Sequence, residues 1–172
     1  MPTNRLIVLL IPLLFAACPQ EADDREMGYK PYTGTAAWTI DGARPGMTLA
    51  ELKLLLGPPA DSSGDPPTSV SWGNPSQRLT VNVDASGRVT QVWGKTLKAG
   101  DVTVLGSGVS DAEIKGVLGK GESKSKTQSG SFVVPTPGKT VGAEHFYRNG
   151  DVLFRFIVMK GEGLTGIVAE RQ

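Results

Sequence analysis

The sequence GMTLAELKLLLG, residues 46–57, returns in altered form as GVSDAEIKGVLG, residues 108–119, with six of twelve positions identical. Each copy is typical of a short helix: a Thr or Ser is followed three residues later by Glu, which is the spacing of a capping box, and a Gly ends the copy. The apolar residues recur every three or four positions and predict one buried stripe on each helix. These stripes consist of Leu52, Leu55 and Leu56 in the first copy and of Ile114, Val117 and Leu118 in the second.

Strand patterns follow each predicted helix. Residues 79–84 alternate apolar and polar side chains, residues 84–87 supply turn chemistry and residues 89–93 resume a strand pattern, which predicts a β-hairpin. In the second copy the apolar strand pattern returns at residues 153–159, and Asn149-Gly150 predicts a tight turn before it.

The two copies together predict the fold class. We expect an α+β protein of two tandem modules, each a helix followed by an antiparallel β-hairpin or sheet, because so short a helix must pack against a neighbouring element to be stable. The first module would span residues 38–99 and the second residues 100–172.

The order of these features resembles a known family. The repeated helix motif, a strand with Trp72 and the hairpin sequence VNVDASGRV at residues 81–89 resemble the SmpA/OmlA outer-membrane lipoproteins, which have the BamE-like fold. The tandem arrangement is similar to beta-lactamase inhibitor protein, which also has two helix-plus-sheet modules. This resemblance implies protein binding or scaffolding in the cell envelope, and it implies no catalytic residue.

The N-terminus predicts export and lipid attachment. Residues 1–17 have a basic start at Arg5, an apolar middle and small residues before Cys18, which is the only cysteine. This pattern resembles a lipoprotein signal peptide ending in a lipobox, so Cys18 is the predicted lipidation site. A conventional secretory signal that leaves a free thiol is the alternative, whereas the apolar run is too short for a transmembrane helix.

The predicted location follows from this start. Residues 18–37 are rich in charged residues, Gly and Pro, and predict a flexible tether behind the lipidated cysteine. We expect the protein at the cell envelope, anchored in the membrane by lipid, with the periplasmic face of the outer membrane favoured over the inner membrane or the cell surface. Whether the two modules act separately, and in which oligomeric state, stays open.

Composition argues against several classes of function. With 18 basic and 17 acidic side chains the net charge is +1, which gives no reason to expect a nucleic-acid partner. One histidine, His145, excludes a metal site made of several histidines, and its neighbours form no catalytic motif, so we expect a half-exposed strand residue. We therefore predict no catalytic residue, no metal site and no cofactor.

The remaining candidates are residues for partner binding. Residues 153–159 are apolar on both faces of one strand, which indicates either a central strand or an adhesive surface. Aromatic residues and Arg dominate binding energy at protein interfaces, so the partner-binding candidates are Trp72, Trp93, Tyr147 and Arg155. The leading hypothesis is a non-enzymatic envelope protein that binds another protein. The alternatives are an inhibitor or immunity protein against an exported enzyme, and a carrier of a small ligand.

Overall fold

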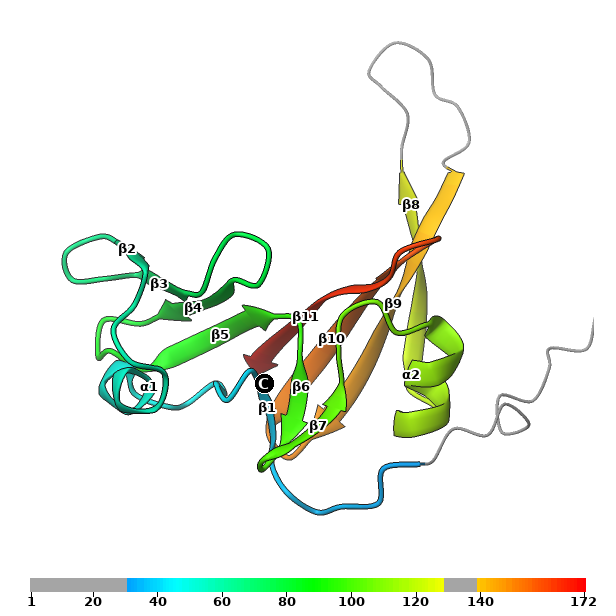
Figure 1. Ribbon diagram of the computed structural model, residues 1–172, viewed down its shortest axis with the longest axis horizontal. Coiled ribbons are helices and arrows are strands. Elements are labelled where there is room, and N and C mark those ends of the chain that lie inside the picture. The colour runs from blue at the N-terminus through cyan, green and yellow to red at the C-terminus, as the bar shows by residue number, and fades with distance from the viewer. Residues whose placement is uncertain (1–30, 129–138) are drawn as a thin grey trace, which may run out of the picture.

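Residues 31–128 and 139–172 are described by a computed structural model. They form two antiparallel sheets of three and eight strands and two short helices (Figure 1). The small sheet has the strand order β1-β6-β7, and the large sheet has the order β2-β3-β4-β5-β11-β10-β9-β8. The elements are β1 (Trp38–Ile40), α1 (Leu49–Leu56), β2 (Asp61–Ser63), β3 (Ser69–Trp72), β4 (Leu79–Val83), β5 (Val89–Gly94), β6 (Leu97–Ala99), β7 (Val102–Leu105), α2 (Asp111–Leu118), β8 (Glu122–Gln128), β9 (Lys139–Asn149), β10 (Val152–Met159) and β11 (Gly163–Arg171).

The predicted fold class is wrong. The protein is mostly β, with one continuous eight-stranded sheet instead of two tandem α+β modules. The sheet is continuous because β5 pairs antiparallel with β11, with Val92 opposite Ala169 and Gly94 opposite Ile167. Hydrogen bonds between these two strands join the two halves of the chain, and each half therefore lacks a sheet edge at this point.

Both predicted helices are confirmed. Thr48 Oγ1 accepts a hydrogen bond from Glu51 N at 3.2 Å, and Glu51 Oε2 accepts one from Thr48 N at 2.7 Å, which completes the capping box of α1. Ser110 Oγ accepts from Glu113 N at 3.1 Å at the start of α2. The predicted stripe of α1 is wrong in one position, because Leu55 is 57% exposed while Leu52 is fully buried.

The predicted hairpins are also confirmed. Strands β4 and β5 pair antiparallel around the turn at residues 84–87, and β9 and β10 pair around Asn149-Gly150. The strand with two apolar faces, β10, is central, since it lies between β9 and β11.

A close approach of side chains to the backbone of β5 brings the small sheet against the large one. Gly94 in β5 is buried, and a Cβ atom at this position would lie 2.5 Å from Ile40 Cγ2 and 2.6 Å from Asp41 Oδ2. Only glycine allows β1 to pack this closely on β5. The core that results contains apolar side chains from both sheets and both helices.

Candidate functional site: the open face of the large sheet

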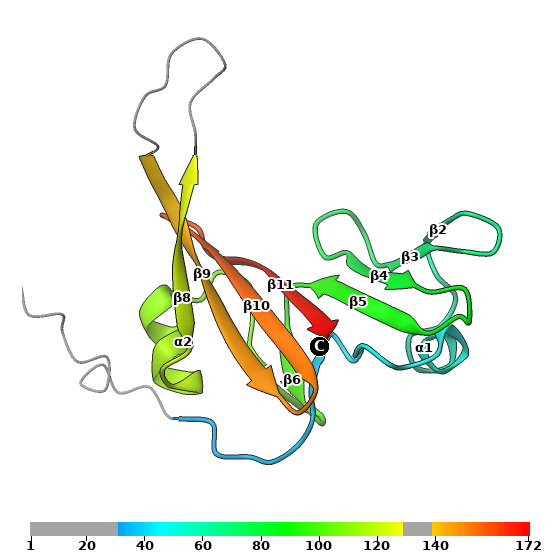
Figure 2. The same cartoon turned by 180° about the vertical axis from the view of Figure 1, so that it is seen from behind.

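The large sheet has one covered and one open face. The covered face packs against the small sheet and the helices, and Val81, Val92, Ala169 and Phe154 lie on it in register. The next residue along each strand points to the opposite face. Figure 2 looks onto strands β9, β10 and β11 from the side where β6 lies behind them.

One row of side chains crosses the open face at right angles to the strands. Paired residues place Thr80 opposite Trp93, Trp93 opposite Val168, Val168 opposite Arg155 and Arg155 opposite Phe146. We call these five residues the Trp93 row. The Trp93 side chain is 46% exposed at the middle of the sheet. Its indole lies over β11, where a Cβ atom on Gly166 would be 3.4 Å from Trp93 Nε1.

The open face is partly apolar around this row. Val168 and Ile157 are only 2% and 7% exposed, although they do not belong to the core cluster of the covered face. Arg155 lies on β10, opposite Val168 of β11, and forms an ion pair with Glu144 at 3.9 Å. The second apolar face of β10 is therefore part of the open face, which explains its departure from simple alternation.

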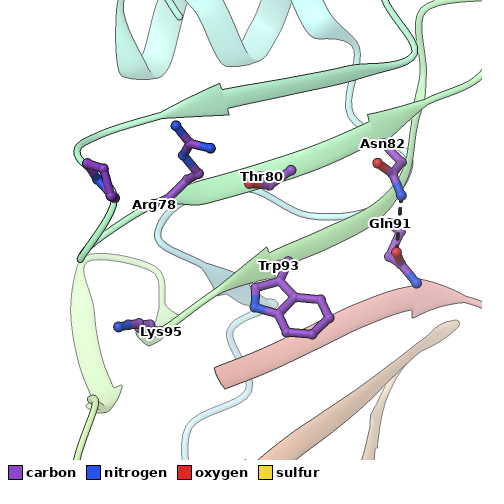
Figure 3. A pocket seen from close by; sticks show the side chains of 7 residues that line it. Arg78, Thr80, Asn82, Gln91, Trp93 and Lys95 are labelled. Atoms are coloured by element: carbon purple, nitrogen blue, oxygen red, sulfur yellow. Dashed lines mark hydrogen bonds between the residues drawn. The ribbon is translucent and has the colours of Figure 1, made fainter. Parts of the chain in front are cut away.

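A shallow pocket of about 420 Å³ adjoins the Trp93 row. It is lined by Pro75, Arg78, Thr80, Asn82, Gln91, Trp93 and Lys95. Figure 3 shows the two cationic side chains at one end, the Asn82–Gln91 pair at the other and the indole of Trp93 between them. Its volume is within the range of small binding sites in proteins.

Of the four predicted partner-binding residues, two are buried and two lie on the open face. Trp72 is 6% exposed on the covered side, and its Nε1 donates to Gly57 O at 3.0 Å. Tyr147 is also buried, and its hydroxyl donates to Gly119 O at 3.0 Å. Trp93 and Arg155 lie together in the Trp93 row. The predicted lipidation site, Cys18, lies outside the described residues.

The polar lining of the pocket was not among the residues predicted from the sequence. Asn82 and Gln91 occupy the polar positions of a predicted alternating hairpin, so their place on the face opposite the core could have been derived from period two alone. Arg78 and Lys95 lie just outside the two strands, where alternation gives no direction for a side chain.

His145 was expected to be half exposed, but it is buried with 1% of its surface exposed. Its Nε2 contacts Asp111 Oδ1, and Asp111 Oδ2 forms an ion pair with Lys115 Nζ at 2.9 Å. Burial raises the pKa of Asp111, but the hydrogen bond from Lys115 and the contact with His145 outweigh this effect and lower the pKa. These contacts attach α2 to β9.

Tyr147 lies close enough to Asp111 to be affected by its charge, and the pKa of Tyr147 can be used to test whether its phenol is buried. Burial first, and then the negative charge of Asp111, raise the pKa of Tyr147 to about 12. The folded chain favours the neutral phenol over the charged phenolate. The stability that this preference adds is fully present below the ordinary tyrosine pKa near 10.0 and is lost as the pH rises toward 12.

We expect the free energy of unfolding of the wild type to fall between about pH 8 and about pH 11 by more than that of Tyr147→Phe. The variant itself should be less stable by about 1 kcal/mol at the lower pH, because it lacks the hydrogen bond to Gly119 O. Urea unfolding of both proteins at the two pH values measures the difference. Parallel pH curves would show that the phenol is not buried as described.

Among residues 31–128 and 139–172, no group of three or more His, Cys, Asp or Glu side chains is arranged to hold a metal ion. Neither helix in these residues is long and apolar enough to cross a membrane.

No protein-family model and no curated protein matches this chain. One solved structure is similar: a DUF4309 family protein, YjgB, from Bacillus subtilis subsp. subtilis strain 168, with 12% sequence identity and a TM-score of 0.46. The similarity covers 85% of this chain and 89% of that one. Neither the SmpA/OmlA lipoproteins nor the beta-lactamase inhibitor family is among these matches.

Proposed function

We propose that this chain is an exported, lipid-anchored protein of the bacterial envelope that binds a protein partner, without catalysis, through the open face of its large sheet. The predicted signal peptide and Cys18 support the location, with the periplasmic face of the outer membrane as the favoured site. The observation that carries the binding proposal is the half-exposed Trp93 in one row with Arg155 on the face opposite the core.

The surroundings of Trp93 support this proposal. Trp and Arg are enriched among residues that contribute most to interface energy, and such residues lie within a surrounding area that excludes water. Thr80, Arg155 and Phe146, which are partly exposed in the same row, provide that area, and the buried Val168 and Ile157 form an apolar base beside Trp93. Because Trp93 and its neighbours lie on central strands, their positions need little further ordering when a partner binds.

The proposal is tested by a photo-crosslinking amino acid placed at position 93 of the anchored protein in living cells. Position 102 is the matched control, since Val102 is also an exposed apolar residue, at 61%, but belongs to the small sheet. We expect a specific crosslinked protein from position 93 and none from position 102. Equal crosslinking from both positions would contradict the proposed surface.

Trp93→Ala should weaken the binding of the recovered protein, once purified, by about tenfold or more, because truncating a central aromatic anchor costs about 2 kcal/mol. Thermal unfolding checks that the variant is folded, which we expect because the side chain is half exposed. An affinity equal to that of the wild type would contradict the role of Trp93.

The identity and location of the crosslinked protein decide between the roles that the sequence left open. An envelope protein recovered with wild type and not with Cys18→Ser would support an assembly or scaffolding role. An exported enzyme recovered with both would make the chain an inhibitor or immunity protein. Crosslinks to small molecules alone would favour a ligand carrier and contradict the proposed partner.

A further inference from the structure

The pocket beside Trp93 has an unbalanced charge. Of the seven lining residues, Arg78 and Lys95 are cationic, and no Asp or Glu lines the pocket in the described part of the chain. Both cations come from the same end, where β4 begins and β5 ends. An anionic group that enters this end meets two cations and no carboxylate in the pocket lining, although Asp41 Oδ2 accepts a hydrogen bond from Lys95 N at 3.2 Å outside the lining.

The two cations also keep hydrogen-bond donors for a ligand. Among the described residues, the side chain of Arg78 makes no hydrogen bond and no ion pair, so its guanidinium donors are available. Lys95 Nζ donates to Ser76 O at 2.8 Å, which orients the ammonium and leaves two further donors. Guanidinium and ammonium groups form their strongest hydrogen bonds with carboxylates and other oxyanions.

The opposite end of the pocket is neutral and offers both kinds of hydrogen bond. Asn82 Nδ2 donates to Gln91 Oε1 at 3.2 Å across the strands. This contact leaves Asn82 Oδ1 as an acceptor and Gln91 Nε2 as a donor. A peptide group, which has one donor and one acceptor, matches such a pair.

We propose that the pocket binds an acidic peptide segment of the partner: a carboxylate lies against Arg78 and Lys95, an apolar side chain lies on Trp93, and a backbone amide bonds to Asn82 and Gln91. This inference rests on the proposed function and names the chemistry of its partner. The Trp93 row favours a peptide over an acidic saccharide, because the half-exposed Trp93 and the partly exposed Phe146 offer apolar contacts in the pocket and beyond it. A protein segment can extend over them, whereas an acidic saccharide has mostly polar groups to offer there.

The cationic character can be tested without the partner. Trp38 and Trp72 are 9% and 6% exposed, so the collisional quenching of tryptophan fluorescence reports mainly on Trp93. The ratio of iodide to caesium quenching is compared with the same ratio for N-acetyltryptophanamide, because iodide is the more efficient quencher of free indole. We expect the ratio of the protein to exceed this reference about threefold at low salt and to approach it at high salt. The excess should also disappear in Arg78→Gln/Lys95→Gln and persist in Lys53→Gln/Lys160→Gln, which removes the same charge from exposed positions elsewhere. A wild-type ratio equal to the reference would overturn the inference.

Direct binding tests the class of ligand. A fluorescein-labelled peptide of alternating Glu and Leu should bind the wild type about tenfold more tightly than its Gln and Leu counterpart, and the Arg78→Gln/Lys95→Gln variant should lose this preference. The Lys53→Gln/Lys160→Gln control should retain it. Binding of polygalacturonate but not of the acidic peptide would overturn the peptide in favour of a saccharide.

The same variants separate this inference from the proposed function. If Trp93→Ala loses the crosslinked partner while Arg78→Gln/Lys95→Gln binds it as the wild type does, the open face is the binding surface and the acidic segment is wrong. If neither variant loses the partner, both proposals are wrong. Circular dichroism and thermal unfolding exclude misfolding as the cause of a loss.

Discussion

Leu52→Asp is expected to abolish the folded state. Leu52 is the buried residue of α1 and is fully enclosed in the core. The change removes about 2 kcal/mol of apolar burial. It also places a carboxylate among apolar side chains, where the charged group costs several kcal/mol and the neutral group lacks partners. The sum is comparable to the whole stability of a typical domain, which is about 5 to 15 kcal/mol.

Leu54→Asp is the matched control, because Leu54 belongs to the same helix but is 89% exposed. We expect a change in the free energy of unfolding of about 0.5 kcal/mol or less. Circular dichroism and urea unfolding of both variants measure the contrast. A folded Leu52→Asp protein with a cooperative transition near that of the wild type would show that α1 does not pack on the sheet.

Arg44→Met is expected to cost about 3 kcal/mol or more of stability. The guanidinium of Arg44 connects two distant parts of the chain: Nη1 donates to Trp38 O at 2.8 Å and to Asn149 Oδ1 at 3.0 Å, and Nη2 donates to Asn149 O at 2.7 Å. It also lies 3.6 Å from an oxygen of Asp151 and 6.0 Å from the centre of the Phe154 ring.

Methionine keeps much of the apolar volume of this side chain but none of its donors. Two backbone carbonyls in a partly buried region would lose their charged donor, and each such loss costs about 1 to 3 kcal/mol. The β1 strand and the turn between β9 and β10 would then be held together by the hydrogen bond from Trp38 N to Asn149 Oδ1, at 3.0 Å, and by apolar packing such as the edge contact between Trp38 and Phe154.

Arg171→Met is the control for this prediction. Arg171 forms a shorter ion pair with the same Asp151, at 2.8 Å, but its side chain is 64% exposed. Exposed ion pairs contribute about 1 kcal/mol or less, so we expect a small effect. Urea unfolding of the two variants compares them directly. A larger loss for Arg171→Met than for Arg44→Met would contradict the bridging role of Arg44.

The local elements of this protein could be predicted from its sequence. The capping residues Thr48 and Ser110, the terminal Gly57 and Gly119, and the Asn149-Gly150 turn act on their immediate neighbours, so a few residues contain the whole signal. The alternation in β4 also assigned one set of side chains to a buried face. Trp72, Trp93 and Tyr147 were candidates for partner binding on the same grounds of residue type, and residue type could not indicate that Trp93 is half exposed while Trp72 and Tyr147 are buried.

The small sheet could not be predicted in the same way. Strands β1 and β6 each contain three residues, which is too few for a period of two to be recognised. The place of β1 depends on Gly94, because the missing side chain lets Ile40 approach β5. A single glycine in a strand does not indicate which residue packs against it.

The sequence alone determined the two helices and the hairpins, because each is encoded in adjacent residues, and for the same reason it predicts an export signal. Only the tertiary structure decided that β5 pairs with β11, which turns two expected modules into one sheet and makes the protein mostly β. That pairing brings Trp93 beside Val168 and Arg155, and so creates the open face. The physical reason is that backbone hydrogen bonds between strands are the same for almost any side chain, so the choice of a distant partner depends on how the whole core packs.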